Sequence, residues 1–290
     1  MSQLAASGPD FICIGMGKSG TGWLYDQLLH HPDFWMPPIK ELHYLDREIP
    51  RIKTADKKLA NRERQGWRVA DESLKRLVER DIAFLEAVKA VRKQRMDLDL
   101  YAGLYRFKGE QMTGDISPSY CAMDEELIAR ILARFPDLKI ILLLRDPVAR
   151  AWSHFTMKQR TDRLDEFILH DPVRFRENLD KSKVFRTGAP ALIARKWQKL
   201  VPEARLRIYY FDDLVGDPAG LKRRVLTFLG ADPQHESALD PRHNRKASKA
   251  KLEMSPQIEA ILVEKFSQEL REAAALLGGH AAQWAAKYGV

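Results

Sequence analysis

With 290 residues, of which 45% are hydrophobic and 30% charged, the chain can bury one good-sized core, and we expect a single domain over residues 1–290. Its longest runs of consecutive apolar residues, such as residues 140–144, are far shorter than the ~20 residues that cross a bilayer, so no transmembrane segment is expected. The net charge of +8 favours a polyanionic partner, whether a nucleic acid, an acidic membrane surface or an anionic ligand, without choosing among them.

The N-terminal segment and the cysteines indicate the compartment. The segment MSQLAASGPD has neither a basic start nor an apolar core, so no secretory signal is expected and we predict a cytoplasmic protein. Cys13 lies in an apolar run that reads as a buried strand, where a free thiol behaves as a small hydrophobe. We therefore expect no structural disulfide between Cys13 and Cys121.

Strand-like and helix-like segments alternate along the chain. Short apolar runs that end at polar, Gly or Pro residues predict strands at residues 11–15, 111–115, 139–144 and 205–211. The segments around residues 23–28, 127–132 and 192–200 carry apolar residues at helical spacing. This alternation predicts an α/β fold with three layers, α/β/α, around a central and mostly parallel sheet, with ligands bound at the carboxyl ends of the strands.

Two further segments are predicted to be helical. Residues 51–100 are highly charged and have a helical pattern, which suggests a helical insert rather than a second domain. Residues 256–277 carry apolar side chains on one face and predict a last helix that packs on the sheet.

The loop after the first predicted strand has the features of an anion-binding loop. Its sequence, Gly-Met-Gly-Lys-Ser-Gly-Thr-Gly, precedes a helix that we expect to begin near Thr21, so backbone N–H groups and the helix dipole face the same point as Lys18. The loop departs from the G-x-x-x-x-G-K-[ST] pattern of triphosphate sites, because Ile12 stands where the first glycine belongs. It resembles a P-loop, and we predict phosphate binding. The alternative is a tight turn that holds no ligand.

The segment ILLLRDPVARAWSHF predicts a second anion site. Arg145 ends a strand, and Asp146 can cap a helix that has Pro147 at its first position and carries Ser153. A P-loop nucleotide kinase or NTPase would use Asp146 as a magnesium ligand, but Arg145 beside it and Ile12 in the first loop argue against that alternative. An arginine at a strand end with a serine on the next helix suits a second phosphate group, and so a nucleotide with two separate phosphate sites.

These two segments resemble the signature segments of sulfotransferases that use 3′-phosphoadenosine 5′-phosphosulfate (PAPS). The resemblance implies that the loop holds the 5′-phosphosulfate and that the strand-end arginine and the downstream serine hold the 3′-phosphate. The residues to which it gives donor-binding roles are Lys18, Ser19, Gly20, Thr21, Gly22, Trp23, Arg145 and Ser153.

Within that family the segment Glu41-Leu42-His43-Tyr44-Leu45-Asp46 is similar to the E-x-H-F-F-D segment of the heparan sulfate type of glycan sulfotransferases and their bacterial relatives. The resemblance implies that Glu41 is the catalytic base, and a carboxylate can take the proton that an attacking hydroxyl or amine loses. His43 would orient Glu41 or serve as an alternative base. The competing interpretation is an ordinary amphipathic strand over residues 40–44.

Residues 114–120, Gly-Asp-Ile-Ser-Pro-Ser-Tyr, resemble a third family segment, which implies that Ser117 and Tyr120 border the acceptor cleft; an ordinary Ser-Pro turn is the alternative. The glycan enzymes often carry cations where this chain has Gly22 and Ile116. Their absence favours a smaller and less anionic acceptor than a heparan-like polymer.

The basic run in residues 241–255 resembles the family loop that closes over the nucleotide. The resemblance implies that Lys249 and Lys251 contact the 3′-phosphate, with Arg245 and Lys246 behind them. A solvated surface loop is the alternative interpretation.

Together these features predict a PAPS-dependent sulfotransferase. It would transfer a sulfonate group to a hydroxyl or amine of a glycan, lipid or small-molecule acceptor and release adenosine 3′,5′-bisphosphate (PAP), with Lys18 stabilising the leaving phosphate. No Cys/His cluster suggests a metal, and no aromatic-basic interleaving suggests a nucleic acid partner. The sequence gives no prediction of oligomeric state.

Overall fold

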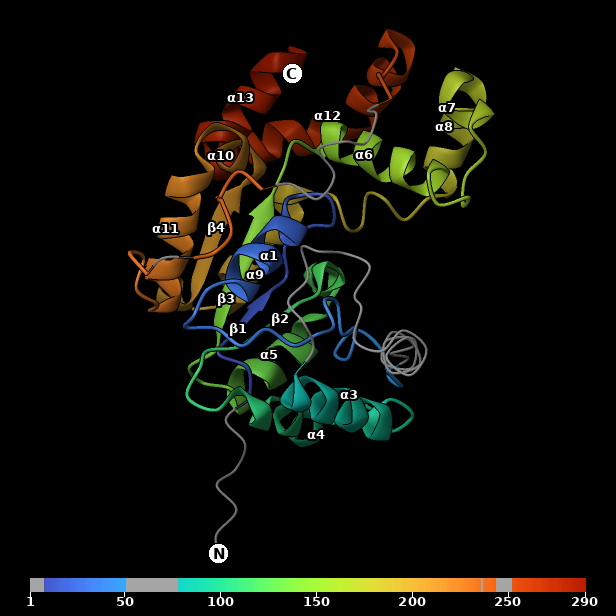
Figure 1. Ribbon diagram of the computed structural model, residues 1–290. Helices are drawn as coiled ribbons and strands as arrows, with labels where there is room; N and C mark the ends of the chain where they lie inside the picture. Colours follow the sequence, from blue (N-terminus) through green and yellow to red (C-terminus); the bar gives the residue numbers. More distant parts are fainter. Residues whose placement is uncertain (1–7, 51–77, 236, 244–251) are drawn as a thin grey trace, which may run out of the picture.

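The computed structural model describes residues 8–50, 78–235, 237–243 and 252–290 (Figure 1). Its sheet has four strands in the order β2-β1-β3-β4, and every neighbouring pair is parallel. The strands are β1 (Phe11–Cys13), β2 (Gly114–Ile116), β3 (Lys139–Leu144) and β4 (Leu206–Tyr210). This arrangement confirms the predicted α/β class and the parallel central sheet.

Helices account for most of the remaining described residues. The α-helices are α1 (Thr21–Leu29), α3 (Glu79–Val91), α4 (Leu98–Gly103), α5 (Glu125–Arg134), α6 (Pro147–Gln159), α7 (Phe167–His170), α8 (Pro172–Lys181), α9 (Pro190–Leu200), α10 (Phe211–Gly216), α11 (Pro218–Leu229), α12 (Pro256–Leu277) and α13 (Gly279–Tyr288). Three short 3₁₀ helices are η1 (Leu104–Lys108), η2 (Pro118–Ala122) and η3 (Glu203–Arg205). None of the helices in the described ranges is long and apolar enough to cross a membrane.

The alternation of side chains along the strands creates the three layers. On β3, Ile141 and Leu143 join one buried cluster with α1 and α11, whereas Ile140, Leu142 and Leu144 join a second cluster with α5, α6, α9 and α12. In Figure 1, α1 lies in front of the strands and α9 behind them. Because both faces of the sheet are covered, β3 reads as the continuous apolar run from which it was predicted.

The register brings the carboxyl ends of the strands to one edge of the sheet. Phe11 of β1 pairs with both Gly114 and Lys139, so the three strands start level. The chain after β1 still bonds to β3, through the Met16 N–H and the Leu143 carbonyl at 3.0 Å. Gly15 makes this close pairing possible, because a Cβ there would lie 2.7 Å from the backbone nitrogen of Leu143.

Several predicted boundaries are confirmed. α1 begins at Thr21, and α12 has the predicted bounds, but it is not the last helix, because α13 follows it. Asp146 caps α6 as predicted, since its carboxylate accepts the N–H of Val148 at 2.9 Å and of Ala149 at 3.3 Å, with Pro147 at the first helical position. The predicted strand at residues 111–115 is shifted by a few residues, to 114–116.

The other segment-level predictions have mixed outcomes. Of the predicted helical insert at residues 51–100, the part from residue 78 contains α3 and the start of α4, and residues 51–77 lie outside the described residues. Residues 40–44 form no strand, so the interpretation of this segment as an ordinary amphipathic strand is wrong. Cys13 and Cys121 are both free and buried.

Candidate active site

The loop between β1 and α1 has left-handed backbone at two positions. Lys18 has φ 77° and Gly20 has φ 95°, and the Ser19 N–H donates to the Met16 carbonyl at 3.2 Å. Lys18 is a non-glycine residue in this conformation, which costs about 1–3 kcal/mol and is typical of functional loops. The turn leads directly into α1, whose N-cap Gly20 supplies no side-chain hydrogen bond and whose first turn holds no acidic residue. The positive end of the α1 dipole therefore faces the loop without a carboxylate of that turn to offset it.

Ser19 and Arg145 give this loop the chemistry of an anion site. The Ser19 side chain is buried, and its Oγ has no hydrogen-bond partner among the described residues. Arg145 donates from Nη1 to the Lys18 carbonyl at 2.8 Å, and its guanidinium stacks over the Phe211 ring at 4.1 Å from the centroid. Burial lowers the pKa of Arg145, which still stays cationic at neutral pH. An orphaned hydroxyl beside a fixed cation fits a phosphate or sulfate group.

Arg150 is a second cation at the loop, and it is fully buried. Its Nη2 donates to the Val184 carbonyl at 2.8 Å, and its Nη1 contacts the Gly17 carbonyl at 3.5 Å. Burial lowers the pKa of Arg150 to about 10, so the side chain is charged at neutral pH. Arg150 belongs to the segment that predicted the second anion site, but the sequence assigned it no role there.

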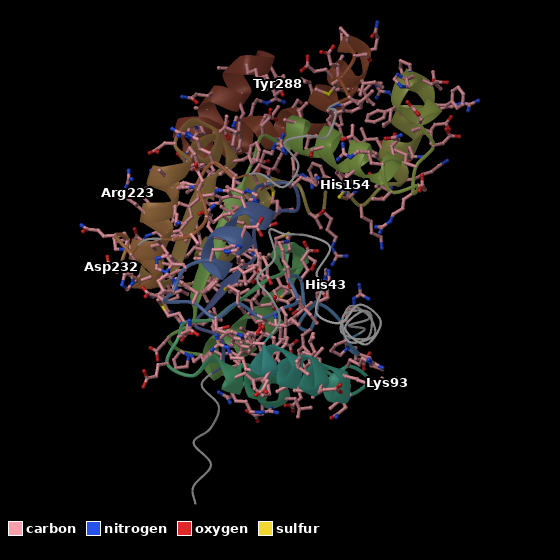
Figure 2. The ribbon with its side chains drawn as sticks, in the orientation of Figure 1. His43, Lys93, His154, Arg223, Asp232 and Tyr288 are labelled. Atoms are coloured by element: carbon pink, nitrogen blue, oxygen red, sulfur yellow. The ribbon has the colours of Figure 1, made fainter. Side chains whose placement is uncertain are left out.

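His154 and Ser153 lie on α6, which follows Arg145. Figure 2 shows His154 on the same side of the sheet as His43 in this view. Burial and the positive charges of Arg150, Lys158 and Lys18 lower the pKa of His154 to about 4. Ser153 is half-buried on the same helix. The surroundings of α6 and the loop are thus strongly cationic, which is consistent with an anionic ligand.

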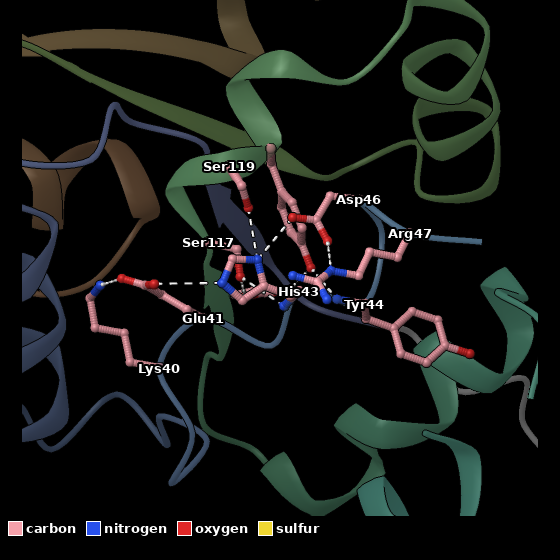
Figure 3. Close-up of polar contacts among 10 residues, drawn as sticks. Lys40, Glu41, His43, Tyr44, Asp46, Arg47, Ser117 and Ser119 are labelled. Carbon is pink, nitrogen blue, oxygen red and sulfur yellow. Dashed lines mark hydrogen bonds and ion pairs between the residues drawn. The ribbon is translucent and has the colours of Figure 1, made fainter. Parts of the chain in front are cut away.

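Glu41, His43 and Asp46 form an ionic chain after α1. The imidazole Nε2 of His43 lies 3.6 Å from Glu41 Oε2, and its Nδ1 lies 2.8 Å from Asp46 Oδ2. Lys40 Nζ lies 2.6 Å from the other oxygen of Glu41, and Ser119 Oγ lies 2.9 Å from His43 Nδ1. Figure 3 shows the imidazole of His43 between Glu41 and Asp46. The sequence assigned roles to Glu41 and His43 but none to Asp46 and Ser119.

This chain fixes the protonation states of the two central residues. Burial raises the pKa of Glu41, but the imidazole of His43 and the ammonium of Lys40 outweigh it and lower that pKa to about 2. The Asp46 and Glu41 carboxylates raise the pKa of His43 to about 9. At neutral pH Glu41 is therefore an anion that can accept a proton, and His43 is an imidazolium that cannot.

Backbone hydrogen bonds connect Glu41 to the strand ends. The Glu41 N–H donates to the carbonyl of Ile116, the last residue of β2, at 3.1 Å. The Ser117 N–H donates to the carbonyl of Cys13, the last residue of β1, at 3.2 Å. The carboxylate segment and the anion-binding loop thus begin from neighbouring strand ends, where open parallel sheets bind ligands.

Glu41 and His43 also have left-handed backbone, with φ 66° and 52°. For non-glycine residues this conformation costs about 1–3 kcal/mol each and persists only where surrounding contacts hold it. Sequence alone did not predict it: histidine is enriched in this region but glutamate is not, and positive φ is uncommon for any non-glycine residue.

The pH dependence of stability should report the His43 chain. The pKa of His43 is raised from 6.5 to about 9 in the folded protein, so its contribution is fully present below pH 6.5 and is lost as the pH rises through 9. We expect the difference in free energy of unfolding between wild type and His43→Gln to be largest near about pH 6 and to fall to its smallest value by about pH 10, measured by urea denaturation. A difference that stays constant over this range would contradict the raised pKa.

Ser117 and Tyr120 are both fully buried beneath the Glu41 segment. Ser117 Oγ accepts the His43 N–H at 3.4 Å, and the Tyr120 hydroxyl accepts the Tyr44 N–H at 3.0 Å. Their predicted contact with the acceptor stays a prediction, and their observed contacts are with the backbone of residues 43–45. Ile116 is buried in the core, whereas Gly22 is exposed with open space around it.

The remaining donor-binding predictions concern Trp23 and the basic run. The Trp23 indole N–H donates to the Pro241 carbonyl at 2.7 Å, and the Trp152 indole N–H donates to the Leu252 carbonyl at 3.0 Å. Two described residues of the run, Pro241 and Leu252, are therefore hydrogen-bonded to α1 and α6. The four cations that were predicted to lie at the 3′-phosphate are outside the described residues: Lys249, Lys251, Arg245 and Lys246.

Asp146 is not available as a magnesium ligand. One carboxylate oxygen caps α6, and the other accepts the hydroxyl of Tyr288 at 2.7 Å and lies 3.5 Å from Lys287 Nζ. This is a structural reason to reject the role that a kinase or NTPase would give it. Within the described ranges, no group of three or more His, Cys, Asp or Glu side chains is arranged to hold a metal ion.

Comparison with known proteins gives consistent matches. A family model described as "Sulfotransferase family" matches residues 9–236. Human heparan sulfate glucosamine 3-O-sulfotransferase 3B1 is 31% identical over 227 residues, which cover 77% of this chain and 46% of that protein. The mouse 3A1 enzyme is 34% identical over 125 residues, which cover 41% of this chain and 31% of that protein. The matches thus span less than half the length of these curated relatives.

Solved structures with the same fold include two sulfotransferases. The sulfotransferase from Alicyclobacillus acidocaldarius has a TM-score of 0.64 at 22% identity, over 95% of this chain and 98% of that one. Mouse sulfotransferase SULT7A1 complexed with PAP has a TM-score of 0.53 at 13% identity, over 97% of this chain and 89% of that one. At these identities the likeness shows the fold alone.

Proposed function

This chain belongs to the sulfotransferase family, and from that premise we propose that it transfers a sulfonate group from PAPS to a hydroxyl or amine of an acceptor. The observation that carries the proposal is the pairing of two features at neighbouring strand ends. One is an anion-ready loop with the orphaned Ser19 hydroxyl and Arg145, and the other is an ionised carboxylate, Glu41, held by an imidazolium. Mouse SULT7A1, which has the same fold, was solved with PAP, and we propose the same nucleotide for this chain.

In this proposal the loop binds the 5′-phosphosulfate. Lys18, Ser19 and the first N–H groups of α1 supply charge and donors, and Arg145 with Ser153 serves the 3′-phosphate. The turn and the start of the helix let the backbone approach the anion, and they are formed by Gly20, Thr21, Gly22 and Trp23. Lys249 and Lys251 stay proposed contacts of the 3′-phosphate.

Glu41 is proposed as the base. The acceptor oxygen or nitrogen attacks sulfur, the bond from sulfur to the bridging phosphate oxygen breaks, and the acceptor proton passes to Glu41, leaving PAP. A carboxylate with a pKa of about 2 is a weak base at rest, but the acceptor proton becomes acidic as the new bond forms. His43, already protonated, would orient Glu41 rather than take the proton, and Lys18 would stabilise the leaving phosphate.

The acceptor is proposed to be small and weakly anionic, whether glycan, lipid or metabolite. Ile116 is apolar and buried at a position where the family resemblance often implies a lysine, and Gly22 offers no cation at the loop. Heparan sulfate is the substrate named for the relatives, and we do not propose it as the acceptor of this chain. A cytoplasmic location and a single domain also stay predictions.

Calorimetric titration tests the proposed donor. PAP should bind without added magnesium, whereas ATP, with or without magnesium, should bind at least ~10-fold more weakly, because the loop lacks the leading glycine and Asp146 is already bonded. An acceptor screen can then follow PAP release from PAPS. Tight, magnesium-dependent ATP binding with no PAP binding would reject the proposal in favour of a P-loop kinase or NTPase.

A further inference from the structure

A buried carboxylate with several hydroxyl donors lies beneath the proposed catalytic segment. Asp115 of β2 is 2% exposed and accepts hydrogen bonds from Ser117 Oγ at 2.7 Å, Tyr120 OH at 2.8 Å and Tyr101 OH at 3.1 Å. Tyr105 OH donates to Tyr101 OH at 3.2 Å, one step farther away. No lysine or arginine within the described ranges forms an ion pair with Asp115. Burial raises its pKa, which these hydroxyl bonds oppose.

Two of the hydroxyls that bond to Asp115 also hold the catalytic segment. Tyr120 OH accepts the N–H groups of Tyr44 at 3.0 Å and Leu45 at 3.3 Å, and Ser117 Oγ accepts the N–H of His43 at 3.4 Å. Two hydroxyl oxygens therefore accept the backbone N–H groups of three consecutive residues, 43–45.

Asp115 sets the direction of these hydrogen bonds. A hydroxyl has one proton to donate and two lone pairs that accept, and the carboxylate oxygens of Asp115 accept the protons of Ser117 and Tyr120. Since Tyr120 and Ser117 give their protons to Asp115, their lone pairs must face the N–H groups of residues 43–45. For Tyr120 the count closes, with one bond donated and two accepted.

The segment needs such support because it lies outside any helix or strand and has left-handed backbone at Glu41 and His43. We propose that Asp115 is a positioning residue, which acts through Tyr120 and Ser117 to hold the backbone of residues 43–45 and thereby the alignment of Glu41, His43 and Asp46. The inference rests on the proposed function of Glu41 and assigns no contact between Asp115 and the substrates.

Two tyrosine variants of the same cluster test this inference. Tyr120→Phe removes the hydroxyl that joins Asp115 to the segment, whereas Tyr105→Phe removes a buried hydroxyl that does not touch it. We expect Tyr120→Phe to lower kcat by about 10- to 100-fold and Tyr105→Phe to change it by less than about 3-fold, because a small misalignment at the reacting atoms has a large effect on rate. The PAP affinity should stay unchanged in both variants.

Titration of His43 by NMR gives a readout that does not depend on turnover. In Tyr120→Phe the pKa of His43 should fall by at least about one unit toward its ordinary value as the chain loosens, and in Tyr105→Phe it should stay raised. If the wild type proves inactive with PAPS, the proposed function fails, but this titration still decides the positioning role.

Two results would overturn the inference. One is an equal loss of kcat and of the raised His43 pKa in both variants, which would indicate general damage to the core. The other is a Tyr120→Phe variant that keeps both the wild-type kcat and the raised pKa of His43. Should Tyr120→Phe not fold, Ser117→Ala carries the same test through the His43 N–H, with the same expected directions and a smaller change.

Discussion

Replacing Glu41 with glutamine is expected to lower kcat by at least ~100-fold while leaving the PAP dissociation constant within about 2-fold of wild type. Glutamine keeps the size of the side chain and can still receive a hydrogen bond, but it cannot take a proton. We propose Glu41 for that task because His43 is protonated and because Asp46 is the more buried carboxylate, with 16% of its side chain exposed against 42% for Glu41. Steady-state kinetics by PAP release and calorimetry with PAP measure the two quantities separately.

Glu48→Gln provides the matched control for this substitution. Glu48 follows in the same segment and forms an exposed ion pair with Arg95, so the same chemical change there should leave kcat nearly unaltered. A Glu41→Gln enzyme that retains its kcat would show that the base is another group. That result would also remove the catalytic reason for the strained backbone at Glu41.

The parts of the fold that sequence predicted well are those fixed by local interactions. The start of α6 follows from Asp146 and Pro147, which act within one turn of the helix. The strand β3 follows from its own apolar run, because a parallel strand is buried on both faces. The paired motifs at Lys18 and Arg145 led to the correct family, because each lies at a strand end whose position was predicted.

The internal contacts of the site could not be predicted in the same way. His43 bonds to Ser117 and Ser119, which are 74 and 76 residues away along the chain, and its Nδ1 also pairs with Asp46. Such pairings depend on the register of β1 and β2 and on left-handed backbone at residues that rarely adopt it. The protonation states of Glu41 and His43 follow from these contacts, and so does the preference for Glu41 over His43 as the base.

Replacing Arg145 is expected to have the second large effect, and this effect should appear in the affinity for PAP. Arg145→Ala is expected to weaken PAP binding by about 10- to 100-fold, the range that corresponds to the loss of about one charge-assisted hydrogen bond. The exposed Arg223 on α11 offers a control with the same change in net charge, and Arg223→Ala should bind PAP as the wild type does (Figure 2). Calorimetry at a fixed salt concentration measures all three proteins.

A second nucleotide separates the two possible roles of Arg145. If the guanidinium serves the 3′-phosphate, Arg145→Ala should weaken the binding of PAP much more than that of adenosine 5′-monophosphate, which lacks that group. Lys18→Ala, at the loop, should weaken both nucleotides to a similar extent. Arg145 also donates to the Lys18 carbonyl, so equal losses for both nucleotides in Arg145→Ala would mean that it acts by holding the loop. In that case the 3′-phosphate site would have to be built from other residues, and the assignment of Ser153 would fail with it.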